Sequence, residues 1–184
     1  MKKTWVGLVT SLILMTAEIV LAQTTWKGLK FGMSEADLRK DYTGSVEKLP
    51  ADADGFILVD KNQKVDSWAA EANFLFDAHG KLSQIRLIMN DPFAAESDSK
   101  AIALALAVTD VIPKRLVERY GVPTSRTGEC ALTAEDLVLS KPGKIFTCDQ
   151  LWRSDGQTID MYWSVHNPNL KLLEITYKPL PADL

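Results

Sequence analysis

The chain has 184 residues and a formal net charge of −3 at pH 7, from 21 basic and 24 acidic side chains. This mild acidity, with no cluster of Lys or Arg beyond the first few residues, argues against binding to the phosphate backbone of nucleic acids. The length suits one domain with a substantial hydrophobic core, or two small repeated units that share one core.

Residues 1–22 have the pattern of a cleavable signal peptide. Two lysines precede a mostly apolar stretch, and Val20 and Ala22 are the small side chains expected just before the cleavage point. Glu18 argues against a retained membrane anchor, because an ionised carboxylate in hydrocarbon costs roughly 2.5–3.5 kcal/mol on insertion scales. We therefore expect residues 23–184 to form a single exported domain, periplasmic or secreted, with no membrane span after cleavage.

Two cysteines follow this segment, Cys130 and Cys148. In an oxidising compartment the expected outcome is a structural disulfide, which stabilises a loop of this length by roughly 3 kcal/mol. The alternative, a redox or nucleophilic pair, usually has C-x-x-C spacing or a basic neighbour, and neither feature is present. We predict a disulfide between Cys130 and Cys148.

The first half of the exported region begins with a helix signal. Ser34 followed by Asp37 forms a capping-box pattern, so we expect a short helix that ends near Gly44. Residues 45–55 contain Pro, Asp and Gly and are predicted to be a loop. A short apolar strand is expected at residues 56–60.

A hairpin is predicted next. Residues 68–77 alternate with one apolar face, residues 77–80 have the composition of a tight turn with a glycine, and residues 82–89 alternate again. These patterns favour two antiparallel strands.

The main helical region is predicted at residues 97–120. Residues 102–108 are rich in Ala and Leu and apolar nearly all round, which indicates burial. Pro113 is expected to kink the region or split it into two helices, and Gly121 supplies its stop.

Three further strands are predicted at residues 144–152, 158–165 and 173–177, with turns at residues 154–156 and 166–169. The middle strand alternates clearly, and its predicted inward-facing residues are Ile159, Met161, Trp163 and Val165.

The resulting order is helix, three strands, helix, three strands. This order predicts the α+β class, with an antiparallel β-sheet packed against helices. It also suggests two tandem helix-plus-β-meander units, a structural repeat of residues 26–92 and 97–178.

Two segments resemble a known group of exported domains. Residues 26–38, with Gly32-Met33-Ser34 and Leu38, resemble the G-M-[ST]-x-x-x-[VL] opening of the β-lactamase-inhibitor-protein family and of the small lipoprotein of the outer-membrane β-barrel assembly machinery. Residues 116–123 resemble the helix-ending L-G-x-P step of the same domains. The resemblance implies a non-enzymatic, protein-binding exported domain of the cell envelope. The chain lacks the lipoprotein's lipidated Cys and any loop that matches a known inhibitory contact, so tethering and inhibition do not carry over.

Catalytic and metal-binding signals are sparse. The two histidines, His79 and His166, fall in predicted turns without neighbouring ligands, and no zinc, phosphate-loop or dinucleotide pattern occurs. We therefore expect no cofactor and no metal. Carboxylates such as Glu135 and Asp136 are expected in loops or at helix starts. A hydrolase whose site is assembled only in three dimensions stays open as an alternative.

The C-terminal strands carry the candidate binding residues. Tyr162 lies opposite the inward-facing set, beside Asp160, and Trp152 belongs to the preceding strand. Aromatic side chains among polar ones are typical of protein interfaces. The leading hypothesis is an open sheet face, with Trp152, Asp160 and Tyr162, that binds another exported or envelope protein. A further alternative is a small-ligand carrier with a cavity between the 97–120 helix and the sheet. The oligomeric state stays open.

Overall fold

The protein is seen in a computed structural model that describes residues 26–50, 55–65, 68–90, 99, 103, 105–141, 143–166 and 169–180. The predicted signal peptide lies outside these residues. The elements in chain order are η1 (Trp26–Gly28), α1 (Glu35–Asp41), β1 (Glu47–Pro50), β2 (Phe56–Val65), β3 (Trp68–Phe76), β4 (Leu82–Asn90), the π-helical η2 (Ala107–Val111), α3 (Ile112–Tyr120), β5 (Ser125–Gly128), α4 (Ala134–Leu139), β6 (Ile145–Ser154), β7 (Gln157–His166) and β8 (Asn169–Pro179).

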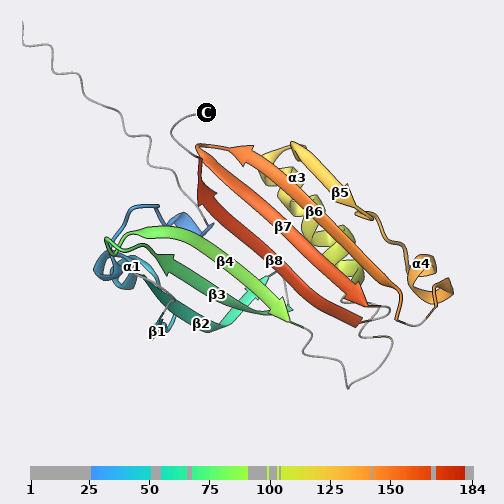
Figure 1. Ribbon diagram of the computed structural model, residues 1–184, viewed down its shortest axis with the longest axis horizontal. Coiled ribbons are helices and arrows are strands. Elements are labelled where there is room, and N and C mark those ends of the chain that lie inside the picture. The colour runs from blue at the N-terminus through green and yellow to red at the C-terminus, as the bar shows by residue number, and fades with distance from the viewer. Residues whose placement is uncertain are drawn as a thin grey trace, which may run out of the picture.

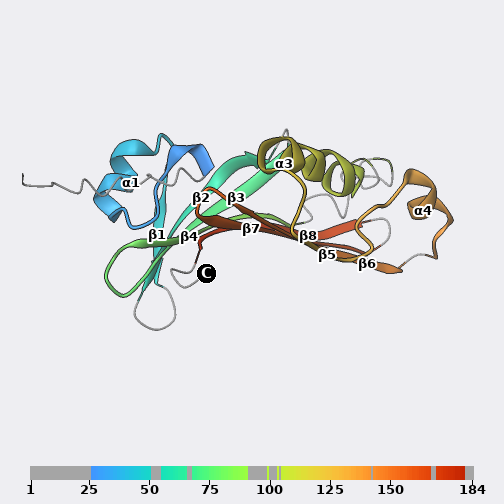
Figure 2. The same ribbon diagram turned by 90° about the horizontal axis from the view of Figure 1, so that it is seen from above.

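Within these ranges the strands form one eight-stranded antiparallel sheet in the order β1-β2-β3-β4-β8-β7-β6-β5 (Figure 1). Strands β1 to β4 make one meander and β5 to β8 another, and their last strands pair from Ile85 opposite Tyr177 to Asn90 opposite Leu172. Helices α1 and α3 lie over the same face of the sheet (Figure 2). The predicted α+β class with an antiparallel sheet is confirmed, with the sheet dominant and the helices short.

The helix-covered face of the sheet carries the hydrophobic core. Strand β7 shows this most clearly, because all four residues predicted to face inward are fully buried: Ile159, Met161, Trp163 and Val165. Large apolar side chains of this kind each stabilise the fold by about 1.5–3 kcal/mol when removed from water. The two-residue period of the strands therefore fixes which face receives the helices.

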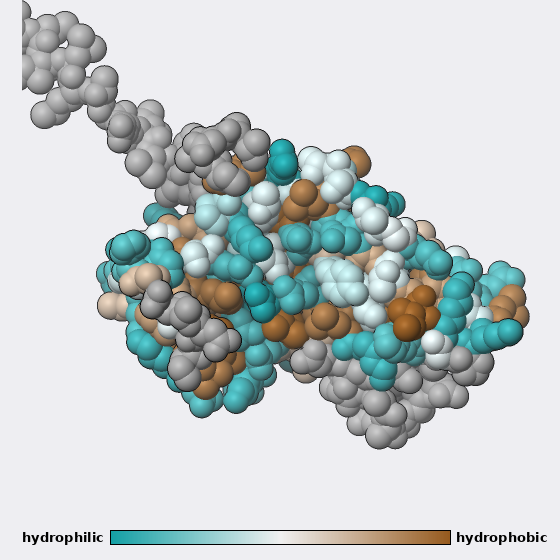
Figure 3. Space-filling view, viewed as in Figure 1, coloured by the Kyte–Doolittle hydropathy of each residue, from teal (hydrophilic) through white to brown (hydrophobic). Residues whose placement is uncertain are grey.

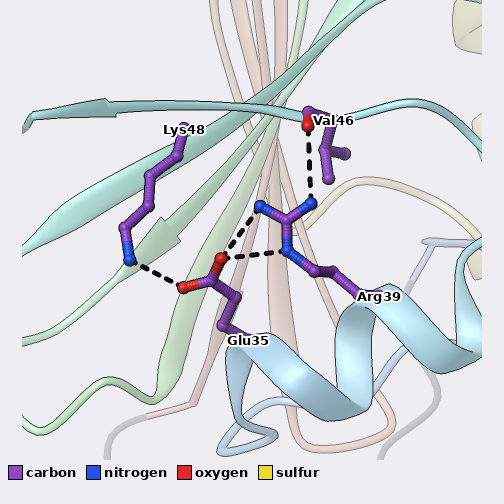
Figure 4. Close-up of polar contacts among 4 residues, drawn as sticks. All are labelled: Glu35, Arg39, Val46 and Lys48. Carbon is purple, nitrogen blue, oxygen red and sulfur yellow. Dashed lines mark hydrogen bonds and ion pairs between the residues drawn. The ribbon is translucent and has the colours of Figure 1, made fainter.

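Helix α1 begins with the predicted capping box. The Ser34 hydroxyl accepts a hydrogen bond from the Asp37 amide at 3.2 Å, and the Asp37 carboxylate accepts one from the Ser34 amide at 3.1 Å. The Glu35 carboxylate then contacts Arg39 at 2.9 Å and Lys48 of β1 at 2.7 Å (Figure 4). The Lys48 hydrogen bond is the main cause that lowers the pKa of Glu35. These contacts attach α1 to the edge strand.

Two expectations for the first meander are wrong. The predicted loop at residues 45–55 contains a strand, Glu47–Pro50, that pairs with β2 at the sheet edge. Charged residues and a terminal proline hide such a strand in the sequence, since both are typical of exposed edges. Strand β2 also extends past residue 60 to Val65, because a register shift between Asp60 and Gln63 carries the pairing onward.

A buried polar cluster connects the end of α1 to the register shift in β2. The Asp60 carboxylate, 1% exposed, accepts hydrogen bonds from the Tyr42 hydroxyl at 2.9 Å, the Asn62 amide at 2.8 Å and the Gln63 side chain at 2.8 Å. Burial, followed by the bond to Asp60, raises the pKa of Tyr42. A Cβ atom on Gly44 would overlap with both Asp60 and Tyr42, so this position requires glycine.

The expected break at Pro113 takes the form of a change in helix type, with no gap between the two helical elements. Pro113 lies in the first turn of α3, and the preceding residues, Ala107–Val111, form a π-helical turn in which the Ile112 amide donates to the Ala107 carbonyl. A proline ring collides with the carbonyl four residues earlier and offers no N–H. The wider π turn accommodates both effects, so the helical path continues.

The second meander contains two elements that were not predicted, β5 and α4. Helix α4 begins with a second capping box, because Thr133 and Asp136 exchange hydrogen bonds of 3.1 and 2.8 Å. The predicted disulfide between Cys130 and Cys148 is present and joins the segment after β5 to β6.

No helical segment within the described residues combines the length and apolar character that a membrane span requires.

Candidate functional site

The face of the sheet turned away from α1 and α3 is the candidate site. Figure 3 shows this face, on which hydrophilic side chains gather over the central strands. The strand period sends residues 158, 160, 162, 164 and 166 of β7 to it, opposite the fully buried set. Asp160 and Tyr162 therefore lie here, and Tyr162 is 37% exposed.

Trp152 does not belong to this face, which corrects its predicted place beside Asp160 and Tyr162. Trp152 of β6 stands opposite Ile159 of β7, so both side chains point to the helix-covered face. Trp152 is 0% exposed, and its indole N–H donates to the Gly121 carbonyl at the end of α3 at 2.9 Å. Its role in the structure is to attach α3 to the second meander.

A polar hollow occupies the centre of the open face. It has a volume of about 160 Å³ and takes residues from four adjacent strands, β4, β8, β7 and β6. Its lining residues are Gln84, Arg86, Asp149, Asp160, Tyr162, Glu174, Thr176 and Lys178. We refer to these residues as the polar hollow.

The strand register explains why these side chains meet. Tyr162 stands opposite Asp149 on one side and Glu174 on the other, while Asp160 stands opposite Thr176. Asp149 and Asp160 are thus diagonal neighbours on one face of an antiparallel pair, a spacing within reach of side-chain contact. Two carboxyl groups therefore lie side by side in the hollow.

The carboxylates of the hollow differ in their partners. The Glu174 carboxylate forms an ion pair with Arg86, with 3.2 Å between its Oε1 and the Arg86 Nε, and accepts a hydrogen bond from the Thr176 hydroxyl at 2.9 Å. Asp160 has one carboxyl oxygen that is buried and makes no hydrogen bond within the described part of the chain. Burial, and then the charge of Asp149, raise the pKa of Asp160 to about 6. The pair therefore changes its charge close to neutral pH.

The sequence reasoning missed six residues of the hollow, of which two are neutral and four are charged: Gln84, Thr176, Arg86, Asp149, Glu174 and Lys178. Each occupies a polar position in an alternating strand, which is the signal that could have indicated an exposed face. The missing information was the pairing of β4 with β8, because no local pattern shows that these strands are neighbours.

The two histidines are not brought together. His79 lies in the turn between β3 and β4, where its amide donates to Asp77 at 2.9 Å. His166 is the last residue of β7, rather than a turn residue as predicted, and pairs with Asn169 at the start of β8. The β4–β8 register places these positions at opposite ends of the sheet.

Over the residues that the structure describes, no cluster of three His, Cys, Asp or Glu side chains could hold a metal ion.

The polar hollow is suited to recognise a positive charge. Its three carboxyl groups exceed its two cations by one when all are ionised, and one cation, Arg86, already pairs with Glu174. Tyr162 also lines the hollow, and aromatic rings attract cations over their faces. Comparison of the chain with models of protein families, with curated proteins and with solved structures finds no match.

Proposed function

We propose that this protein is an exported, non-enzymatic binding module of the periplasm or cell envelope, which binds another exported protein through the helix-free face of its sheet. The partner inserts a Lys or Arg side chain into the polar hollow, where Asp160 and Asp149 receive it. The observation that supports this proposal most strongly is the buried, unpartnered oxygen of Asp160 beside a second carboxyl group. Such an orphaned acceptor costs free energy that a donor from a ligand recovers.

Other features agree with export. The disulfide fits an oxidising compartment, and the signal-peptide pattern of residues 1–22 points to the same location. The resemblance of residues 26–38 to small envelope domains also favours a role in protein binding. We further infer that the two meanders are tandem copies of one helix-plus-meander unit, since each follows a helix and each ends in a strand at the shared centre.

The test is capture of partners from an envelope extract of the source cells, with quantitative mass spectrometry. We expect a reproducible partner whose capture falls at least tenfold with Asp160→Asn combined with Asp149→Asn, and also with Tyr162→Ala. Capture should weaken between pH 7.5 and pH 5, because protonation of Asp160 removes a charge that a cation needs.

Two control variants are available. Asp155→Asn removes a carboxylate from the exposed β6–β7 turn, and Ile145→Ala removes an exposed apolar side chain, 56% accessible, from the distal end of the same face. Both should leave capture unchanged. A partner that is captured equally by the folded Asp149/Asp160 double variant and by the Tyr162 variant would rule out the polar hollow as the binding site.

A second candidate function follows from the same pair of carboxyl groups. An acid with a pKa of about 6 beside another carboxylate is an arrangement that hydrolases use for general acid–base catalysis. Purified protein that hydrolysed generic ester, peptide or glycoside substrates, and lost this activity with Asp160→Asn but kept it with His79→Ala, would favour the hydrolase over the binding module.

A further inference from the structure

A pocket lies on one flank of α3, between the helical path through η2 and α3 and the segment of residues 130–133 that follows β5. Its volume is about 540 Å³, which is within the range of roughly 300–1,000 Å³ that small-molecule sites occupy. Its lining residues are Thr109, Asp110, Pro113, Lys114, Val117, Glu118, Arg126, Cys130, Ala131, Leu132 and Thr133. We name it the flank pocket.

The helical wall of the flank pocket combines one polar and two apolar positions. Thr109, Pro113 and Val117 follow one another at intervals of four residues, which places them along one side of the helical path. Val117 is only half-buried, so part of this wall is open to a ligand.

The opposite wall is held in place by a covalent bond. Cys130 is joined to Cys148 of β6, and Leu132 is 7% exposed, so the segment between them and the sheet has a fixed position. Ala131, which also lines the pocket, is exposed. The pocket therefore has a rigid second wall with accessible apolar surface.

A polar group without a partner lies in this pocket. Thr109 is 4% exposed, and its hydroxyl oxygen makes no hydrogen bond within the described part of the chain. Thr133, the other threonine of the lining, instead donates to the Asp136 carboxylate at 2.7 Å. Buried hydroxyl groups are normally paired, so the Thr109 hydroxyl is a candidate ligand contact.

The backbone at Thr109 also lacks a usual partner. In a continuous α-helix its carbonyl would accept a hydrogen bond from the residue four positions later, but that residue is Pro113, which has no N–H. Thr109 lies within the π-helical turn Ala107–Val111, and such turns occur frequently at functional sites. A ligand hydroxyl can both donate to this residue and accept from it.

The charged side chains of the flank pocket balance one another. Asp110 and Glu118 are acidic, and Lys114 and Arg126 are basic. Lys114 pairs with Asp110 at 2.8 Å, and Arg126 donates a hydrogen bond to Gln150 at 3.2 Å. Because the lining has no surplus charge to compensate an ion that loses its water, it favours a neutral ligand.

We propose that the flank pocket binds a neutral, mostly apolar molecule that carries a hydroxyl group, of the size of an alkylphenol. The ligand hydroxyl contacts Thr109, and the hydrocarbon part lies against Val117 and Leu132. A hydrocarbon without the hydroxyl group leaves Thr109 unpaired. The pocket shares no described lining residue with the polar hollow, and its ligand does not depend on the proposed protein-binding function.

The test is calorimetric titration of the purified, oxidised protein at pH 7.5 with 4-propylphenol, propylbenzene and 4-propylbenzoate. We expect saturable binding of 4-propylphenol, at least fivefold weaker binding of propylbenzene, and at least tenfold weaker binding of 4-propylbenzoate. Thr109→Val should abolish the preference for the phenol over the hydrocarbon, and Thr109→Ser, which keeps the hydroxyl group, should retain it. Circular dichroism should show that both variants are folded.

Two further variants test the place of binding. Ala131→Trp puts a large side chain on an exposed position of the pocket and should weaken binding of 4-propylphenol at least tenfold, whether or not the Thr109 variants fold. The control Thr158→Val removes the same hydroxyl group from β7, outside the pocket, and should change nothing. Absence of saturable 4-propylphenol binding, an unchanged preference in folded Thr109→Val, or unchanged binding in folded Ala131→Trp would each overturn the proposal.

Discussion

Asp60 in the first meander is fully buried and Asp160 in the second is partly buried, and the surroundings of the two carboxyl groups are opposite. Asp60 lies under α1 and receives hydrogen bonds from Tyr42, Asn62 and Gln63. Asp160 lies on the helix-free face, beside the carboxyl group of Asp149, with one oxygen that has no partner in the described part of the chain.

The difference separates a structural carboxylate from a candidate functional one. Buried polar groups are normally paired, and a paired group contributes to a unique fold. An unpaired group beside a like charge instead carries an unfavourable free energy that a ligand can relieve. The comparison therefore predicts that substitutions at the two aspartates change stability in opposite directions.

The largest effect is expected at Asp60. Asp60→Ala leaves the Tyr42 hydroxyl and the Asn62 and Gln63 donors without their acceptor, and should lower the free energy of unfolding by about 3 kcal/mol. Urea unfolding at pH 7.5 measures this change. Asp160→Ala is the matched variant and should not destabilise the protein. Equal losses at both positions would remove the distinction between the two carboxylates.

The second prediction concerns the covalent link, which lies only in the second meander. Replacing Cys130 and Cys148 by Ser should lower stability by roughly 3 kcal/mol, because the unfolded chain gains the entropy of an open loop. Hydrogen exchange should show the loss of protection in β5 and β6, with β1 to β4 retaining theirs. Reductant should destabilise the natural protein and leave the double Ser variant unaffected. Loss of protection throughout the sheet would show that the two meanders do not differ in this respect.

Local sequence signals predicted the local parts of this fold. The capping box at Ser34 and Asp37 predicted α1, and the alternation in residues 158–165 predicted the inner face of β7. The same capping signal at Thr133 and Asp136 would have indicated α4. Each of these patterns is complete within a few residues, which is why the sequence alone reveals it.

The candidate site was only partly predictable, because it depends on long-range pairing. Asp160 and Tyr162 follow from the alternation of one strand, but Asp149, Arg86 and Glu174 join them only through the order β4-β8-β7-β6. Trp152 was misplaced for the same reason, since only the register with Ile159 reveals which face it occupies. Strand order and register arise from packing of the whole sheet, so no short motif shows them.

A smaller effect is expected for Tyr42→Phe in the first meander. This change keeps the ring, which packs edge to face on Phe74 at 4.9 Å, and removes only the hydroxyl that donates to Asp60. The free energy of unfolding should fall by about 1–2 kcal/mol, less than for Asp60→Ala, because two other donors still reach the carboxylate. Thermal unfolding measures the change. Tyr162→Phe is the control, since this exposed tyrosine lies on the open face, and a comparable loss there would contradict a specific role for the Tyr42–Asp60 bond.

An effect of similar size and opposite sign is expected for Asp160→Asn. The pKa of Asp160 in the folded protein is raised to about 6, above the ordinary value of 3.8, so the folded state binds this proton more tightly than the unfolded state does. The resulting stabilisation is fully present below about pH 4 and is lost as the pH rises through about 6. Asn cannot ionise, so the variant should be more stable than the natural protein by about 1–2 kcal/mol at pH 7.5, with allowance for partial solvent screening.

The two proteins should converge near pH 4. The control variant Asp155→Asn, in the exposed turn, should have the same stability as the natural protein at every pH. A constant difference between pH 4 and pH 7.5 would show that the carboxyl group of Asp160 is not strained by its burial and by Asp149, and the contrast with Asp60 would then lie in packing rather than in charge.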